Sequence, residues 1–119
     1  MRYIILIYGS EDHVARWAPE EEKEVMSRHA GLREELTAKR RLGPVMRLTP
    51  NGARTVRRYK ERKHITDGPF IESKEQLMGI YVVEGTFEDA VAATDRLAFE
   101  TGVFEIWPLM FFEPGVVAR

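Results

Sequence analysis

The sequence predicts a mixed α+β domain with the element order β-α-β-β-α-β, built on an antiparallel sheet with two helices on one face. Three observations predict it. Two strongly apolar runs, at residues 3–8 and 77–84, have the length of buried strands. Each run is followed by a segment with helical periodicity, and a charged stretch that resembles a β-hairpin separates the two halves.

The first half begins with the run at residues 3–8, which Gly9 and Ser10 end. We expect a loop at residues 11–18 and then a long helix with Pro19 at its first position, followed by three glutamates that suit the positive helix end. The buried face of this helix is marked by apolar residues and one histidine at spacings of three and four: Val25, Met26, His29, Leu32 and Leu36.

Basic residues at 39–41 suit the end of that helix, and Gly43-Pro44 is expected to stop it. A short strand follows at residues 45–48. Residues 53–59 and 64–66 then resemble a hairpin whose tip is Lys60–Lys63. This extra hairpin is basic, with positively charged side chains and one histidine at Arg54, Arg57, Arg58, Lys60, Arg62, Lys63 and His64.

The second half contains the strand at residues 77–84 and a helix that starts at Thr86 with a capping-box pattern. A last strand is expected at residues 103–110, with Pro108 placing its end at a sheet edge or a bulge. This order is the ferredoxin-like arrangement, with residues 3–8 and 77–84 at the centre of the sheet. Helices cover only one face, so a second subunit is the simplest cover for the other.

Composition places the chain among soluble globular proteins. Its 119 residues suit one domain spanning 1–119, with 44% hydrophobic and 31% charged residues and a net charge of −1. The absence of cysteine excludes disulfides and thiol chemistry. We expect no signal peptide, no membrane contact, no cofactor and no metal, and a cytoplasmic location.

Two residues are candidates for chemistry. His29 lies on the apolar stripe of the first helix, and imidazole is the natural proton-transfer group near neutral pH. Asp67 precedes Gly68-Pro69, a stiff corner, and a carboxylate beside an imidazole would orient it. The alternatives are a core histidine bonded to backbone and an aspartate bonded to its own turn. Sequence alone leaves open whether the two residues meet.

Other patterns are weaker. Tyr81 shares a strand face with Gly79, where a ligand could approach, although core packing also explains it. Residues 72–76 are polar and suit either ligand contact or a solvated loop. The basic hairpin could bind nucleic acid with Tyr59 stacking on a base. However, the slightly acidic chain and the absence of nucleic-acid motifs favour a solvated hairpin that protects a sheet edge.

The corner Asp67-Gly68-Pro69-Phe70, its continuation Lys74-Glu75-Gln76 and the following strand resemble the DGPF motif of the YCII-related family. The opening strand and the helix around Ser27-Arg28-His29 are also similar, so the resemblance covers nearly the whole chain. It implies a dimeric α+β barrel, with His29 and Asp67 as catalytic candidates. Phe70, Lys74 and Tyr81 would then be ligand-binding candidates.

The same resemblance implies two kinds of function. Similar proteins include a chloromuconolactone dehalogenase, whereas others look like accessory partners of extracytoplasmic-function sigma factors. Two departures count: Met78-Gly79 replaces the family's usual Gly-Gly, and Trp107 stands where the last strand usually carries an arginine. Because Trp107 lacks the positive charge of that arginine, this departure argues against a carboxylate-bearing substrate.

Two hypotheses follow. One is a small-molecule enzyme in which His29 and Asp67 perform general acid–base chemistry: elimination, isomerisation or dehalogenation. The other is a non-catalytic ligand-binding or regulatory dimer, which would include an accessory to sigma-factor regulation. A closed, partly apolar cavity holding both residues, with a shifted imidazole pKa, would favour the enzyme.

Overall fold

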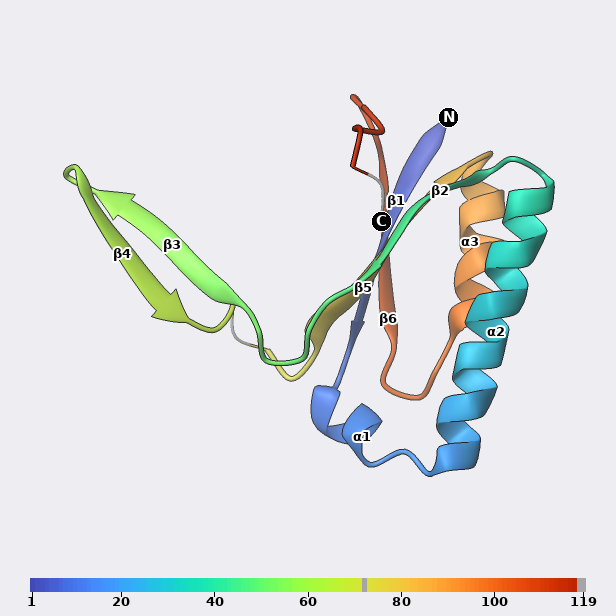
Figure 1. Ribbon diagram of the computed structural model, residues 1–119, viewed down its shortest axis with the longest axis horizontal. Helices are drawn as coiled ribbons and strands as arrows, with labels where there is room; N and C mark the ends of the chain where they lie inside the picture. The colour runs from blue at the N-terminus through green and yellow to red at the C-terminus, as the bar shows by residue number, and fades with distance from the viewer. Residues whose placement is uncertain (72, 118–119) are drawn as a thin grey trace.

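A four-stranded antiparallel sheet with the order β2-β5-β1-β6 forms the body of the molecule (Figure 1). The computed structural model describes residues 1–71 and 73–117, so Glu72 of the polar segment 72–76 lies outside the described residues. The four strands span β1 (Arg2–Gly9), β2 (Leu42–Arg47), β5 (Gln76–Glu84) and β6 (Val103–Pro108). The chain is therefore a mixed α+β protein, as the sequence predicts.

The two most apolar strands, β1 and β5, lie at the centre of the sheet, where the sequence places them. Ile5 pairs with Tyr81 in the β1–β5 ladder, and both side chains are almost fully buried. Because side chains alternate along a strand, Ile5 and Ile7 face the helices while Leu6 between them faces the other side. β6 ends at Pro108 instead of residue 110 and is an edge strand, as that proline requires.

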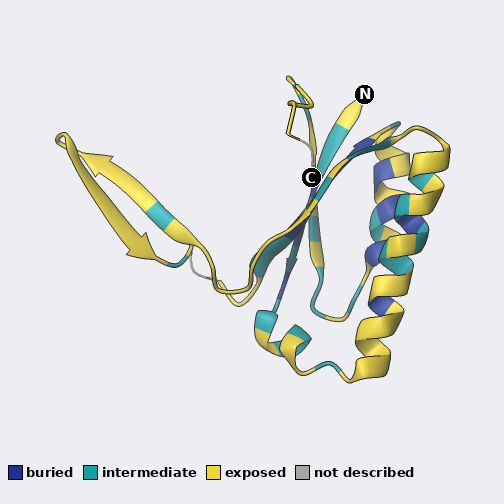
Figure 2. Ribbon diagram, viewed as in Figure 1, coloured by how far each residue is buried: buried dark blue, intermediate teal, exposed yellow. Residues whose placement is uncertain are grey.

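Two helices, α2 (Pro19–Ala38) and α3 (Phe87–Leu97), cover one face of this sheet (Figure 1). Figure 2 shows their buried residues turned towards the strands. Leu32 of α2 and Leu97 of α3 are each 1% exposed and belong to one core cluster with the central strands. In α3 the predicted capping box is present: the Thr86 hydroxyl accepts from the Asp89 amide at 3.1 Å. No helix in residues 1–71 and 73–117 could cross a bilayer.

The loop expected at residues 11–18 contains a short helix, α1 (Glu11–Ala15), so that prediction is wrong. The Ser10 hydroxyl caps it by accepting from the His13 amide at 3.2 Å, and Glu11 and Asp12 occupy its first turn. A serine followed by acidic residues is a helix-start signal, and it outweighs the shortness of the segment here. The helix places the following segment, including Trp17, beside the sheet.

The end of α2 also differs from expectation, since Gly43-Pro44 do not stop it. The helix ends at Ala38, and Arg40 takes a positive φ of 55° where the chain turns back. Gly43 and Pro44 instead belong to β2, which extends from residue 42. Proline is tolerated there because β2 is an edge strand.

The basic hairpin forms a separate two-stranded sheet, β3 (Arg54–Tyr59) with β4 (Arg62–Asp67), which we call the arm. It projects from the body at the left of Figure 1. Its tip is shorter than Lys60–Lys63: only Lys60 and Glu61 form the turn, with φ of 49° and 64°. The corner glycine, Gly68, has a φ of 97°, the left-handed region that glycine enters without strain.

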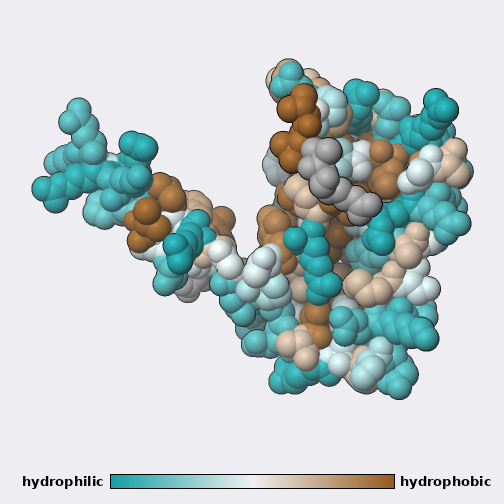
Figure 3. All heavy atoms as spheres, in the orientation of Figure 1, coloured by the Kyte–Doolittle hydropathy of each residue, from teal (hydrophilic) through white to brown (hydrophobic). Residues whose placement is uncertain are grey.

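Large apolar side chains are exposed in two places. On the arm, Val56 and Ile65 form a cross-strand pair, and each is 57% exposed. On the open face of the main sheet, Trp107 is also 57% exposed and lies opposite Ile4. Figure 3 shows brown patches on both the arm and the body. The face that helices leave uncovered therefore carries exposed apolar side chains.

Candidate functional site

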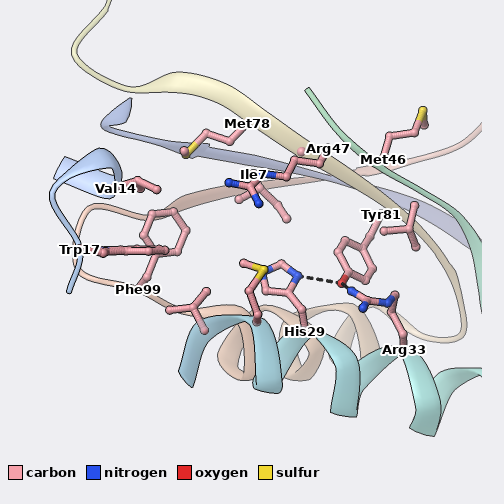
Figure 4. A pocket seen from close by; sticks show the side chains of 14 residues that line it. Ile7, Val14, Trp17, His29, Arg33, Met46, Arg47, Met78, Tyr81 and Phe99 are labelled. Atoms are coloured by element: carbon pink, nitrogen blue, oxygen red, sulfur yellow. Dashed lines mark hydrogen bonds between the residues drawn. The ribbon is translucent and has the colours of Figure 1, made fainter. Parts of the chain in front are cut away.

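A cavity of about 400 Å³ lies between α2 and the sheet, closed at one end by α1 and the residues that follow it (Figure 4). Its wall is mostly apolar, and the residues at its two ends differ. One end is formed by aromatic and sulfur-containing side chains of four separate segments: Trp17, Met26, Met78 and Phe99. The other end holds the polar groups His29, Arg33, Arg47 and Tyr81. A mostly apolar hollow with a few convergent polar groups is the usual form of a small-molecule site.

The aromatic end is ordered by ring packing. The rings of Trp17 and Phe99 meet edge to face, with centroids 5.8 Å apart and planes at 87°. Phe99 in turn packs edge to face against Phe104 of β6. Because three rings from three segments brace one another, this end of the cavity has a defined shape.

His29 points from α2 into the cavity, and its Nδ1 lies 2.8 Å from the hydroxyl oxygen of Tyr81 on β5. The helical stripe that predicts His29 on the sheet-facing side is confirmed. Tyr81 is only 1% exposed, so its ring is part of the core while its hydroxyl reaches the imidazole. Tyr81 therefore packs in the core and also lines the cavity, and its role in ligand binding stays a prediction.

Arg33, one turn after His29 on α2, completes a short hydrogen-bonded series. Its Nη1 donates to the Tyr81 hydroxyl oxygen at 3.3 Å. Because that oxygen accepts from Arg33, the Tyr81 hydroxyl proton is left to be donated to Nδ1 of His29. The imidazole is then the Nε2–H tautomer, and Nε2–H is its remaining donor.

The pKa of His29 is lowered to about 4, mainly by burial and then by the nearby cations Arg33, Arg28 and Arg47, in that order. The imidazole is therefore neutral at pH 7. Burial raises the pKa of Tyr81, although Arg33 works in the opposite direction through its hydrogen bond and its charge. The pair consequently consists of a neutral phenol and a neutral imidazole.

The structure of the chain does not bring Asp67 to His29. Asp67 is the last residue of β4 on the arm, its side chain is 96% exposed, and its carboxylate lies 3.7 Å from Nε of Arg54. It is not among the described residues that line the cavity. Within one chain the imidazole has Tyr81 as its partner in the place expected for the aspartate.

The other two motif residues lie outside the cavity as well. Phe70 is 68% exposed, and the guanidinium of Arg57 on the arm lies 5.1 Å from its ring centroid. Lys74 is exposed in the segment before β5. A second hollow, of about 760 Å³, lies at the base of the arm and includes Gly68 and Pro69, but no arginine or histidine lines it among the described residues.

Arg33 and Arg47 are site residues that the sequence reading missed. Arg33 follows His29 by four positions, which places both on one helix face, so the signal was present. Arg47 follows Val45 by two positions on β2 and shares its face, but the predicted strand gave no reason to expect a charge there. In residues 1–71 and 73–117, no three His, Asp or Glu side chains gather as a metal site.

Comparison with known proteins agrees with the sequence resemblance. The family described as the YCII-related domain matches residues 1–113. An uncharacterised protein of Rhizobium meliloti (strain 1021) is 33% identical over 120 residues, and the aligned region covers 97% of each chain.

Proposed function

The chain belongs to the YCII-related family, and we propose that it is a small-molecule enzyme that transfers a proton in the cavity between α2 and the sheet. The observation that carries the proposal is the series Arg33–Tyr81–His29, which ends in that cavity. The substrate would be a small cyclic or carbonyl compound, and the reaction an isomerisation or elimination.

The series supports proton transfer in a definite direction. As a solvent water removes the α-proton of the substrate, the Nε2–H of His29 would give its proton to the enolate oxygen that forms, while Nδ1 receives the Tyr81 proton. One C–H, one N–H and one O–H bond break, and the bonds that form are the O–H of the enol, the N–H at Nδ1 and the O–H of the protonated water. The negative charge moves from the substrate to the Tyr81 oxygen, where Arg33 already donates a hydrogen bond.

Solvent deuterium exchange tests this proposal without a known substrate. A panel of small lactones, cyclic ketones and β-keto acids is incubated with the protein in D₂O, and loss of the α-proton signal is followed by NMR. Wild type should accelerate exchange for at least one compound, and His29→Gln should reduce the rate by about 100-fold or more. Lys23→Gln, which removes an exposed charge of α2 outside the cavity, is the matched control.

The alternative is a ligand-binding or regulatory protein without turnover. The low pKa of His29, about 4, favours it because so weak a base is poorly matched to proton abstraction at neutral pH. Under this alternative no compound in the panel would exchange faster with wild type than with His29→Gln. Ligands would nevertheless bind in the cavity and quench the fluorescence of Trp17.

The ferredoxin-like order and assembly into a dimeric α+β barrel belong to the same proposal. The strand order β2-β5-β1-β6 supports the first, and the apolar open face around Ile4 and Trp107 supports the second. A homodimer that buries this face should become monomeric when Trp107→Glu places a charge there. Light scattering after size exclusion would show the change, and a wild-type monomer would contradict the barrel.

The pairing of His29 with Asp67 remains in the proposal only between two copies, because in its own chain Asp67 lies on the arm. Phe70 and Lys74, at the base of that arm, would reach a ligand in the same way. Complementation decides this: His29→Gln and Asp67→Asn chains are each tested alone and then mixed. If deuterium exchange recovers in the mixture, a site shared between two copies is supported. If the Asp67→Asn protein is fully active by itself, Asp67 is not part of the site.

A further inference from the structure

The charged groups at the cavity all have one sign. Arg33 and Arg47 line it together with His29 and Tyr81, and no carboxylate of the described residues does. Figure 4 shows the two guanidinium groups on either side of the imidazole, Arg33 from the helix and Arg47 from the sheet. A hollow whose charges are only positive concentrates anions and repels cations.

Arg33 and Arg47 differ in what they already bind. Arg33 donates to the Tyr81 hydroxyl, so part of its hydrogen-bonding capacity is used. The guanidinium of Arg47 makes no hydrogen bond or ion pair with the part of the chain that the structure describes. Its place is fixed by β2, where it lies opposite Gly79 of β5. Because Gly79 has no side chain, the space beside Arg47 stays open to the cavity.

Two donors therefore converge on one part of the cavity: the Nε2–H of His29 and the guanidinium of Arg47. Arg47 is among the cations that lower the pKa of His29, which agrees with its position near the ring. Two donors, one of them cationic, without a neighbouring acceptor suit an acidic oxygen of a ligand. The apolar remainder, around Trp17 and Phe99, suits a compact aromatic or cyclic body.

We propose that the ligand is a small apolar monoanion, whose carboxylate or enolate lies between Arg47 and the Nε2–H of His29 and whose ring lies against Trp17 and Phe99. This inference rests on the proposed function for the choice of cavity. One unpaired guanidinium and a mostly apolar wall match one negative charge, not a phosphate with two.

The test compares 4-ethylbenzoate with its neutral isostere 4-ethylbenzamide by isothermal titration calorimetry at pH 7 and constant protein concentration. Wild type should bind the carboxylate about 10-fold to 100-fold more tightly, the range of one or two charge-assisted hydrogen bonds. Arg47→Gln should reduce this preference to about 2-fold or less, while Arg47→Lys keeps most of it. Lys23→Gln, the control for net charge, should leave the preference unchanged.

NMR provides a readout that mere loss of structure would not produce. Binding of 4-ethylbenzoate to wild type should raise the pKa of His29, because an anion stabilises the imidazolium, and 4-ethylbenzamide should not. Equal affinity for the two compounds, or an unchanged preference in Arg47→Gln with folding intact by circular dichroism, overturns the proposal.

The two proposals fail separately. If the carboxylate preference depends on Arg47 but no compound exchanges deuterium, the ligand class stands and the catalytic function is wrong. If exchange depends on His29 but the carboxylate and the amide bind alike, the catalytic function stands and the ligand class is wrong.

Discussion

Lowering the pH should destabilise the folded protein through His29, because the folded state favours the neutral imidazole. The pKa of His29 is lowered from 6.5 to about 4 in the folded protein. Between these values the unfolded chain takes up a proton at this position and the folded protein does not. Stability from this group is therefore complete above pH 6.5 and is lost as the pH falls towards 4.

The expected loss in the free energy of unfolding follows from the pKa shift of His29. A pKa change of this size corresponds to about 3 kcal/mol at roughly 1.36 kcal/mol per unit. His29 is only half-buried, so screening by solvent reduces the figure, and we expect about 1 to 2 kcal/mol. That is a substantial part of the stability of a domain this size.

The assay is urea denaturation of wild type and His29→Gln at intervals from pH 7.5 to pH 4, at one protein concentration and ionic strength. Subtracting the two free energies of unfolding cancels the other titrating groups that the variants share. Wild type should lose about 1 to 2 kcal/mol relative to His29→Gln across the interval. A flat difference, or a wild type that gains stability towards pH 4, would refute the reasoning.

Three further substitutions test single contacts by the same denaturation measurement. Tyr81→Phe removes the hydroxyl that His29 contacts and should cost about 1 kcal/mol; no loss would show that the bond adds nothing. Gly79→Ala places a methyl group 3.1 Å from the Met46 carbonyl oxygen, so β2 must move outward. This should lower the free energy of unfolding by about 1 kcal/mol and make the cavity smaller. Thr86→Ala removes the cap of α3 and should cost about 1 kcal/mol, whereas Thr86→Ser should restore it.

Local pattern predicts those parts of the fold that local forces decide. Residues 3–8 and 77–84 are too apolar to lie anywhere but at the centre of the sheet. The two capping-box residues, Thr86 and Asp89, lie within one helical turn of each other, so the start of α3 can be predicted from local sequence. His29 is predictable for the same reason, since helical periodicity alone places it on the sheet-facing side.

The partner of His29 could not be predicted in this way. Asp67 and Tyr81 both follow the helix by many residues, and which of them meets the imidazole depends on where the arm points. The direction of the arm is set by the chain on either side of it, at Thr49–Ala53 and after Gly68, which carries no periodic signal. Tyr81 meets His29 because Ile5 and Tyr81 pair at the centre of the sheet beneath α2.

The way in which the arm joins the body has a consequence for how this chain can diversify. At its base the amide of Gly68 donates to the Ala53 carbonyl at 2.8 Å, and at the sheet the amide of Leu48 donates to the Met78 carbonyl at 2.9 Å. The arm is thus a closed insertion in the connection between two paired strands. Its length, charge and contacts can change by mutation while the register of β2 on β5, and with it the placement of Arg47 at the cavity, is preserved. The arm can therefore change in sequence without altering the residues of the body that line the cavity.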